Sequence, residues 1–166
     1  MVTKPGLSAT FSLTDHHGNG VTAEDFSGLN VLIYFGFTHC RVVCPRSLAK
    51  LSSVVRGLDD AGLKIKPLYV TVDPERDTPE VMKDYLKQNH PQFTGLTGSV
   101  EAIERVKQDF RVFALRKEDP EDPDGYAVPH TAIAYLIGPD GIYLDHFPDS
   151  MDEDRIFRRI EQLIAG

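Results

Sequence analysis

The sequence has few cysteines, no strongly basic segment and no long hydrophobic run. Two cysteines among 166 residues cannot make a disulfide-rich scaffold, so their spacing matters more than their number. The chain carries 18 Lys and Arg against 25 Asp and Glu, a net charge of -7, and no segment concentrates basic residues as a phosphate-binding surface does. We therefore expect no nucleic-acid partner.

Long apolar segments are also missing. No stretch approaches the roughly 18 consecutive apolar residues that a membrane-spanning helix needs. Residues 1–8 have neither the basic start nor the apolar middle of a signal peptide. The sequence as given is therefore expected to be soluble. Its 166 residues and 41% hydrophobic content predict one compact domain over residues 1–166.

Apolar residues recur with strand and helix periods in turn. Residues 31–35 form a continuous apolar run, typical of a central strand, and residues 45–58 carry apolar side chains at spacings of three and four, typical of a helix. The same reasoning predicts six further elements. They are a strand at 67–72, a helix at 78–86, a short strand at 93–96, a helix at 99–110, a hairpin at 131–147 and a last helix at 156–164. Thr78 and Ser99 are the expected caps of their helices. The order predicts an α/β domain with a mixed central sheet flanked by helices and a C-terminal β-hairpin and helix.

Two further segments lie outside this alternation. Residues 9–15 are expected to add an edge strand or a small hairpin. Glu118–Tyr126 is rich in Asp, Glu and Pro and comes just before Pro129 and His130, so we interpret it as a candidate mobile flap.

Both cysteines fall at one junction between the first strand and the first helix. Ligands in open α/β sheets bind at the carboxyl ends of strands. If the segment winds into a helical turn, Cys40 and Cys44 lie on one face with Cα atoms about 6 Å apart, within reach of a disulfide or of one shared metal ion. Pro45 suits an early helical position, so Cys44 is expected near a helix N-terminus that favours the thiolate, and Arg41 adds to that effect. The alternative is that the two cysteines have no joint function. Their shared position at one strand-to-helix junction argues against that alternative.

Other polar residues are open to more than one interpretation. Asp73 follows the second strand and could line the same edge, whereas Glu75, Arg76 and Asp77 read better as a turn with an ion pair. His16, His17, His90 and His146 lie in expected turns, helix ends or a strand terminus, where an exposed or hydrogen-bonded histidine is ordinary. Spacing alone does not single out His130 as a ligand.

Several separated motifs together resemble the Sco/SenC family. They are Tyr34 to Cys40 with Cys44 and Pro45, Val72 to Pro79, Leu96 to Gly98, and His130 and Thr131 followed by Tyr135 to Ile137. They occur in the family's order, and the resemblance runs from about Phe11 to the last helix.

This resemblance implies a thioredoxin-like fold and a copper site made of Cys40, Cys44 and His130. It further implies copper delivery to the dinuclear copper centre of cytochrome c oxidase, or reduction of the cysteines of that centre. The implied partners are the copper-bearing oxidase subunit or another copper chaperone. Family members usually work outside the cytoplasm, in the periplasm or a membrane-facing equivalent, so we expect an N-terminal anchor or signal to be missing from the sequence as given.

The chemistry of the implied ligands agrees with a soft metal. Two thiolates and one imidazole suit Cu(I), whereas Cu(II) would want a further N or O donor. Oxidation of Cys40 and Cys44 to a disulfide removes both thiolates, so the redox state and metal occupancy should exclude one another. The pair is thus also the expected redox-active centre, with Asp73 and Arg41 as neighbours that tune it.

Three residues depart from the family pattern. Arg41 and Val42 stand where Pro and Asp are common, and Pro129 stands where Asp commonly precedes the histidine. These changes make the site less negative, which favours free thiolates or Cu(I) over Cu(II). A thiol-disulfide oxidoreductase or a redox sensor with little stable metal binding is therefore the alternative function.

Overall fold

The computed structural model describes residues 12–36, 43–89, 92–110, 117–118, 126–127, 133–148 and 150–165. At residues 43–45, 88–89, 117–118 and 126–127 only the backbone is described.

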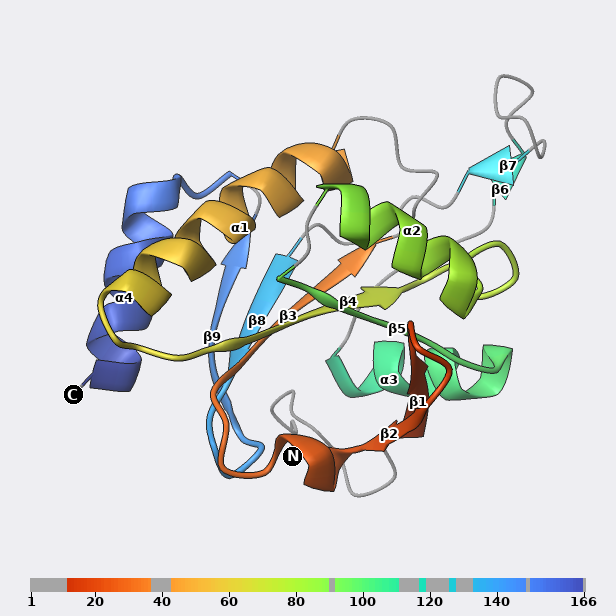
Figure 1. The fold of residues 1–166 in the computed structure, drawn as a ribbon, viewed down its shortest axis with the longest axis horizontal. Coiled ribbons are helices and arrows are strands. Elements are labelled where there is room, and N and C mark those ends of the chain that lie inside the picture. The colour runs from red at the N-terminus through yellow and green to blue at the C-terminus, as the bar shows by residue number, and fades with distance from the viewer. Residues whose placement is uncertain are drawn as a thin grey trace.

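A mixed sheet of seven strands forms the centre of the fold (Figure 1). Its strands are β1 (Ser12–Asp15), β2 (Gly20–Thr22), β3 (Val31–Gly36), β4 (Lys66–Thr71), β5 (Thr94–Thr97), β8 (Ile133–Ile137) and β9 (Tyr143–Pro148). They lie in the order β2-β1-β5-β4-β3-β8-β9. Strands β3, β4 and β5 are parallel, and the pairs β1–β2, β1–β5, β3–β8 and β8–β9 are antiparallel. A separate two-stranded ladder joins β6 (Lys117–Glu118) to β7 (Tyr126–Ala127).

Helices cover both faces of this sheet. Helices α1 (Val43–Asp60), α2 (Pro79–Asn89) and α4 (Glu153–Ala165) pack on one face, where their apolar residues meet Leu32 and Tyr34. Helix α3 (Val100–Phe110) covers the other face, against Ile33 and Phe35. A short 3₁₀ helix, Ala23–Phe26, adds Phe26 to that second core. Strand β3 is buried along its whole length because it has helices on both sides, which explains its unbroken apolar sequence.

The expected elements are present with small shifts of their ends. Helix α1 begins two residues before Pro45, and β4 begins at Lys66. Thr78 and Ser99 cap their helices as predicted, since their hydroxyl oxygens accept the backbone N–H groups of Val81 at 3.3 Å and Ala102 at 3.1 Å. The hairpin expected from residue 131 is confirmed over its described part, β8 and β9, whereas residues 131–132 lie outside the described residues.

The N-terminal expectation is also confirmed in its described part. Strands β1 and β2 form a small hairpin at one edge of the sheet, and β1 joins β5. Of the expected flap, only Glu118 and Tyr126 are described, and they pair with one another across the β6–β7 ladder. Residues 119–125 lie outside the described residues, so the proposed flap stays a prediction.

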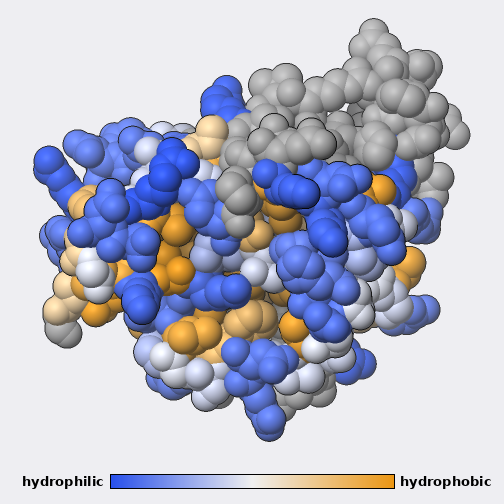
Figure 2. Space-filling model, viewed as in Figure 1, coloured by the Kyte–Doolittle hydropathy of each residue, from blue (hydrophilic) through white to orange (hydrophobic). Residues whose placement is uncertain are grey.

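Large hydrophobic side chains are exposed singly on the described surface. They come from different parts of the chain, except for two that are close in sequence. The exposed residues are Leu29, Val81, Val100, Ile142 and Leu144. In the view of Figure 2, hydrophobic areas lie between hydrophilic ones. Scattered exposed residues of this kind are ordinary and indicate no interface by themselves.

Candidate metal and thiol site

The carboxyl ends of β3 and β4 define the edge of the sheet where the two cysteines were expected. The strands pair in parallel up to Gly36 and Thr71, and the backbone N–H of Val72 donates to the carbonyl oxygen of Gly36 at 2.8 Å. Cys40 follows Gly36 by four residues in the sequence. The chain therefore leaves β3 toward the cysteines at a strand end, as expected for an α/β site.

Cys44 lies in the first turn of α1, as its second residue. The first four backbone N–H groups of a helix lack intrahelical acceptors, and their partial positive charge stabilises an anion such as a thiolate. Pro45 fits this turn because its missing N–H costs no hydrogen bond there. The position predicted for Cys44 is thus confirmed for the backbone, while its side chain is not described.

Strand β8 begins at this same edge. Tyr34 of β3 pairs with Ala134 of β8 in antiparallel register, so the start of β8 at Ile133 lies opposite the end of β3. His130 precedes Ile133 by three residues in the sequence. The topology therefore gives the segments that carry Cys40 and His130 neighbouring anchor points on adjacent strands. Cys40, Arg41, Val42, Pro129 and His130 themselves lie outside the described residues, so the three-residue ligand set stays a prediction.

Asp73 is described, and it is held tightly at the end of β4. Its carboxylate oxygen Oδ2 lies 2.5 Å from Nε of Arg76, and the two side chains are 5% and 7% exposed. The backbone carbonyl of Asp73 accepts the N–H groups of Arg76 at 3.2 Å and Asp77 at 2.9 Å, which closes the turn. The ion pair expected for Arg76 is therefore confirmed. Since Arg76 compensates its charge, Asp73 is better suited to order this edge than to bind a metal directly.

A buried polar network supports the same loop. Thr71 Oγ1 donates to Asp77 Oδ2 at 2.7 Å and accepts the N–H of Asp73 at 2.9 Å. Thr97, at the end of β5, donates its hydroxyl to the carbonyl of Asp77 at 2.8 Å. Asp77 is completely buried, and the hydrogen bond from Thr97 fixes the loop after β4 to β5. Asp77 was expected only as part of a turn, and its buried hydrogen bonds to Thr71 and Thr97 were not predicted.

Two of the described histidines, His16 and His146, make hydrogen bonds through their imidazole rings. His16 Nδ1 accepts the backbone N–H of Gly95 at 2.9 Å, and its ring centroid lies 4.2 Å from that of His17. Burial first, and His17 second, lower the pKa of His16. His146 Nδ1 contacts the hydroxyl of Tyr143. The ordinary interpretation of His16 and His146 is thus confirmed, whereas His90 lies outside the described residues.

Within the described ranges, no group of three or more His, Cys, Asp or Glu side chains is placed to hold a metal ion.

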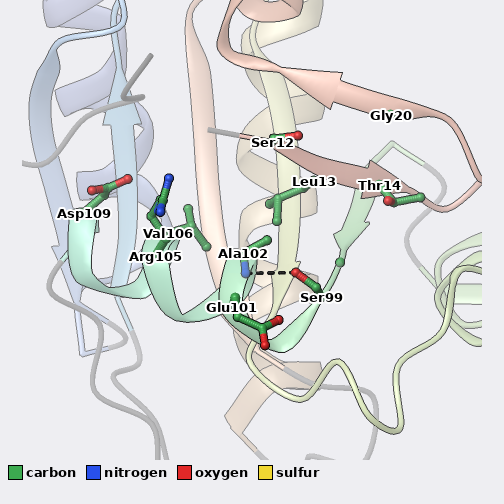
Figure 3. A pocket seen from close by; sticks show the side chains of 11 residues that line it. Ser12, Leu13, Thr14, Gly20, Ser99, Glu101, Ala102, Arg105, Val106 and Asp109 are labelled. Atoms are coloured by element: carbon green, nitrogen blue, oxygen red, sulfur yellow. Dashed lines mark hydrogen bonds between the residues drawn. The ribbon is translucent and has the colours of Figure 1, made fainter. Parts of the chain in front are cut away.

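A cavity of about 470 Å³ lies between β1 and α3 (Figure 3). Its floor includes Leu13 and Val106, and Glu101, Arg105 and Asp109 lie along α3 beside it. Its lining contains no Cys or His, so it does not correspond to the predicted site.

Among the helices of the described part of the chain, none has the length and apolar character needed to cross a membrane.

Comparison with known proteins gives a consistent result over the whole chain. The sequence model of the SCO1/SenC family matches residues 2–165. The zebrafish (Danio rerio) protein SCO2 homolog, mitochondrial, is 46% identical over 153 residues, which are 90% of this chain and 54% of that protein. The human (Homo sapiens) protein SCO1 homolog, mitochondrial, is 46% identical over 146 residues, covering 87% of this chain and 48% of that protein. The chain thus spans about half the length of the curated relatives it matches.

Solved structures agree with the sequence matches. Arabidopsis thaliana ScoI with copper bound superposes with a TM-score of 0.89 at 33% identity, covering 99% of both chains. Yeast Sco1 with copper bound gives a TM-score of 0.88 at 32% identity and covers 99% of this chain and 90% of that one. These similarities confirm the α/β thioredoxin-like fold expected from the sequence.

Proposed function

Because the chain belongs to the SCO1/SenC family, whose model matches residues 2–165, we propose that it binds copper and assists assembly of the dinuclear copper centre of cytochrome c oxidase. The observation that carries this proposal is the similarity of the whole fold to two Sco structures that have copper bound. The protein would act by delivering copper to that centre or by reducing its cysteines.

The proposed ligands are Cys40, Cys44 and His130. The described strand ends support this set, because β3 leads to Cys40, α1 carries Cys44 in its first turn, and β8 is preceded by His130. Two thiolates and an imidazole form a soft donor set that fits Cu(I). The positive end of α1 would help to keep the Cys44 thiol deprotonated, and only the thiolate binds the metal.

The same two cysteines are proposed to act as a redox pair. Joining Cys40 and Cys44 in a disulfide releases two electrons and two protons to an external acceptor, for instance an oxidised protein dithiol. A disulfide has no thiolate ligands left, so copper binding requires the reduced form. Reduction of a partner's disulfide would be this same reaction: the partner's disulfide would take up the two electrons and two protons and become a dithiol, and the reduced, metal-free chain would become the disulfide.

The partner and the location are proposed from the family relationship. A copper-bearing oxidase subunit, or another copper chaperone, would receive or supply the metal. We propose an extracytoplasmic site of action, in the periplasm or a membrane-facing equivalent, with membrane association through an N-terminal segment outside the sequence given.

A thiol-disulfide oxidoreductase or redox sensor with little stable metal binding is the second candidate. It is favoured by Arg41 and Val42 between the cysteines and by Pro129 before His130, since each lowers the negative charge available to a metal cation. The two candidates differ in the role of His130. A copper protein needs its imidazole, whereas thiol exchange between Cys40 and Cys44 does not.

The deciding measurement is the copper content of the reduced protein after anaerobic loading with Cu(I) and gel filtration. We expect one copper per chain in the wild type and in His146→Ala, which removes an exposed imidazole elsewhere. His130→Ala and Cys44→Ser should each lose most of the copper that survives competition with a soluble Cu(I) chelator. Equal retention by His130→Ala would overturn the ligand set.

A parallel thiol assay separates the second candidate. Reduced wild type and His130→Ala are mixed with oxidised glutathione, and disulfide formation is followed by mass spectrometry. Rapid disulfide formation by both proteins, together with no stoichiometric copper in either, would favour the oxidoreductase. Stoichiometric copper that depends on His130 would support the copper-binding assembly protein.

A further inference from the structure

A groove with three arginines lies between the edge strand β9 and helix α4. It has a volume of about 410 Å³, and its lining includes Asp145, Met151, Arg155, Arg158, Arg159 and Gln162. The α4 residues of this set occur at spacings of three and four, so they form one stripe along the helix. The apolar residues Ile156 and Ile160 occupy the buried side of the same helix.

These arginines differ in how firmly they are paired. Arg159 Nε lies 2.7 Å from Asp145 Oδ2. Arg158 approaches Asp154 only to 3.8 Å, and these side chains are 74% and 83% exposed, so water competes strongly with that pair. Arg155 is exposed and has no ion pair among the described residues. The groove therefore presents two available guanidinium groups on a chain whose net charge is -7.

The backbone edge of β9 is protected against addition of another strand. The N–H of His146 donates to the carboxylate of Asp145 at 2.8 Å, so it is already occupied. Pro148 has no N–H, and the β8–β9 register shifts next to Leu136, which marks a bulge. Bulges and proline are devices that prevent edge-to-edge pairing. A ligand in this groove would consequently be recognised by the arginine side chains and not by main-chain pairing.

One end of the groove lies close to the proposed copper site, which was assigned to the side of the sheet where β3 ends. Pro148, the last residue of β9, pairs with Ile133, the first described residue after His130. Met151 follows by three residues, and its carbonyl accepts Lys50 Nζ of α1 at 2.8 Å. In Figure 1 the start of α4 lies at the end of β9 toward which that strand points. A molecule held along α4 would therefore extend to the neighbourhood of the end of β3 and the start of β8.

We propose that this groove docks an acidic segment of the protein that exchanges copper or electrons with the chain. The inference rests on the proposed function, because it assigns the docking surface for that partner. Carboxylates fit the paired donors of Arg155 and Arg158, and electrostatic steering suits a brief encounter. A nucleic acid is disfavoured because the negative net charge repels a polyanion, whereas a short segment with a few carboxylates meets the local positive charge.

Binding of a defined acidic peptide tests the groove. The probe is a blocked, fluorescently labelled heptapeptide, Glu-Asp-Pro-Glu-Asp-Pro-Asp, which repeats residues 118–124 and whose prolines keep it extended. Its amide counterpart, with Gln and Asn in place of the acids, is the uncharged control. We expect the double variant Arg155→Glu with Arg158→Glu to weaken acidic-peptide binding by about tenfold or more at low salt.

A matched variant removes the effect of net charge. Lys83→Glu with Lys87→Glu changes the charge by the same amount on exposed positions of α2, and we expect less than a twofold change in peptide binding. Equal weakening by both double variants would overturn the groove as a docking site. Tight binding of the amide peptide would overturn recognition by charge.

Two further readouts keep this inference separate from the proposed function. The groove variant should retain the copper stoichiometry of the wild type while transferring Cu(I) about tenfold more slowly to a purified copper-accepting oxidase domain at low salt. Unchanged transfer would overturn the docking role even if copper binding is intact, whereas loss of copper in the wild type would overturn the function instead. A wild-type dimer that dissociates in the groove variant would assign the surface to a second copy and overturn a foreign partner.

Discussion

The backbone N–H of Val72 donates a hydrogen bond of 2.8 Å to the carbonyl oxygen of Gly36. This bond extends the β3–β4 ladder one step beyond the last paired residues, Gly36 and Thr71. It joins the exit of β3, which leads to Cys40, to the loop that begins at Asp73. The buried pair of Asp73 and Arg76 is therefore connected through one hydrogen bond to the backbone that positions the proposed thiol site.

The first prediction concerns this buried ion pair. Arg76→Gln should lower the free energy of unfolding by about 3 kcal/mol, because it leaves the Asp73 carboxylate buried without its cation. Asp73→Asn combined with Arg76→Gln should cost less than the single Arg76 change, since no uncompensated charge remains. Urea unfolding monitored by circular dichroism gives the free energies of the wild type, Arg76→Gln, Asp73→Asn and the double variant. Strict additivity of the two substitutions would show that the pair is not coupled.

The second prediction concerns close packing behind β5. A Cβ atom at Gly95 would lie 2.8 Å from Leu86 Cδ1 and 3.0 Å from Met82 Cε, and both of those side chains are buried. Gly95→Ala should therefore destabilise the fold by about 1–3 kcal/mol through overpacking. Gly20→Ala in β2 is the control, because no atom lies within 4 Å of its added Cβ. Thermal unfolding of both variants checks the difference, and equal melting temperatures would contradict it.

The sequence predicted the layers well because each element carries a clear local signal. The unbroken apolar run of β3 marks a strand with helices on both faces, and Thr78 and Ser99 mark helix starts by their side-chain chemistry. The Thr71–Asp77–Thr97 network was not predicted, because its members lie up to 26 positions apart and their contact depends on the pairing of β4 with β5. Local patterns do not contain such tertiary hydrogen bonds.

The residues of the candidate site were less predictable from local sequence patterns than the helices and strands. The strand-to-helix junction indicated Cys40 and Cys44 from position alone, and the backbone of α1 and the end of β3 agree with it. His130 could be named only from the family resemblance, because one histidine before a strand has no distinguishing spacing. The antiparallel pairing of β8 with β3 places the start of β8, three residues after His130 in the sequence, opposite the end of β3, and that pairing is a property of the folded sheet.

The third prediction is a pH dependence of stability. The N–H of Gly95 faces His16 Nδ1, so the neutral imidazole is the form that accepts this hydrogen bond. The pKa of His16 is lowered in the folded state by burial first and then by His17. Its stabilising contribution is therefore complete above the unfolded pKa of about 6.5 and decreases as the pH falls below that value toward the folded pKa.

The variant His16→Asn tests this dependence, because its Oδ1 occupies the position of Nδ1 and can accept the same N–H without titrating. The free energy of unfolding is measured in urea between about pH 7.5 and pH 5.5. The wild type should lose more stability than the variant over this interval. Parallel curves for the two proteins would contradict a role for His16.

The last prediction concerns the metal preference set by the residues between the cysteines. Arg41→Pro with Val42→Asp removes a cation and adds a carboxylate next to the proposed ligands, restoring the residues that the family commonly has there. Each change in charge should favour a bound dication, and together they should raise Cu(II) affinity by about tenfold or more while changing Cu(I) affinity less. Competitive titration with each ion, followed by the visible absorption of the Cu(II)–thiolate bond, measures both affinities. Arg41→Gln, which removes the cation alone, is the intermediate control and should give part of the gain. Tight Cu(II) binding already in the unsubstituted protein would contradict the effect assigned to Arg41 and Val42, because their charge would then not limit binding of the dication.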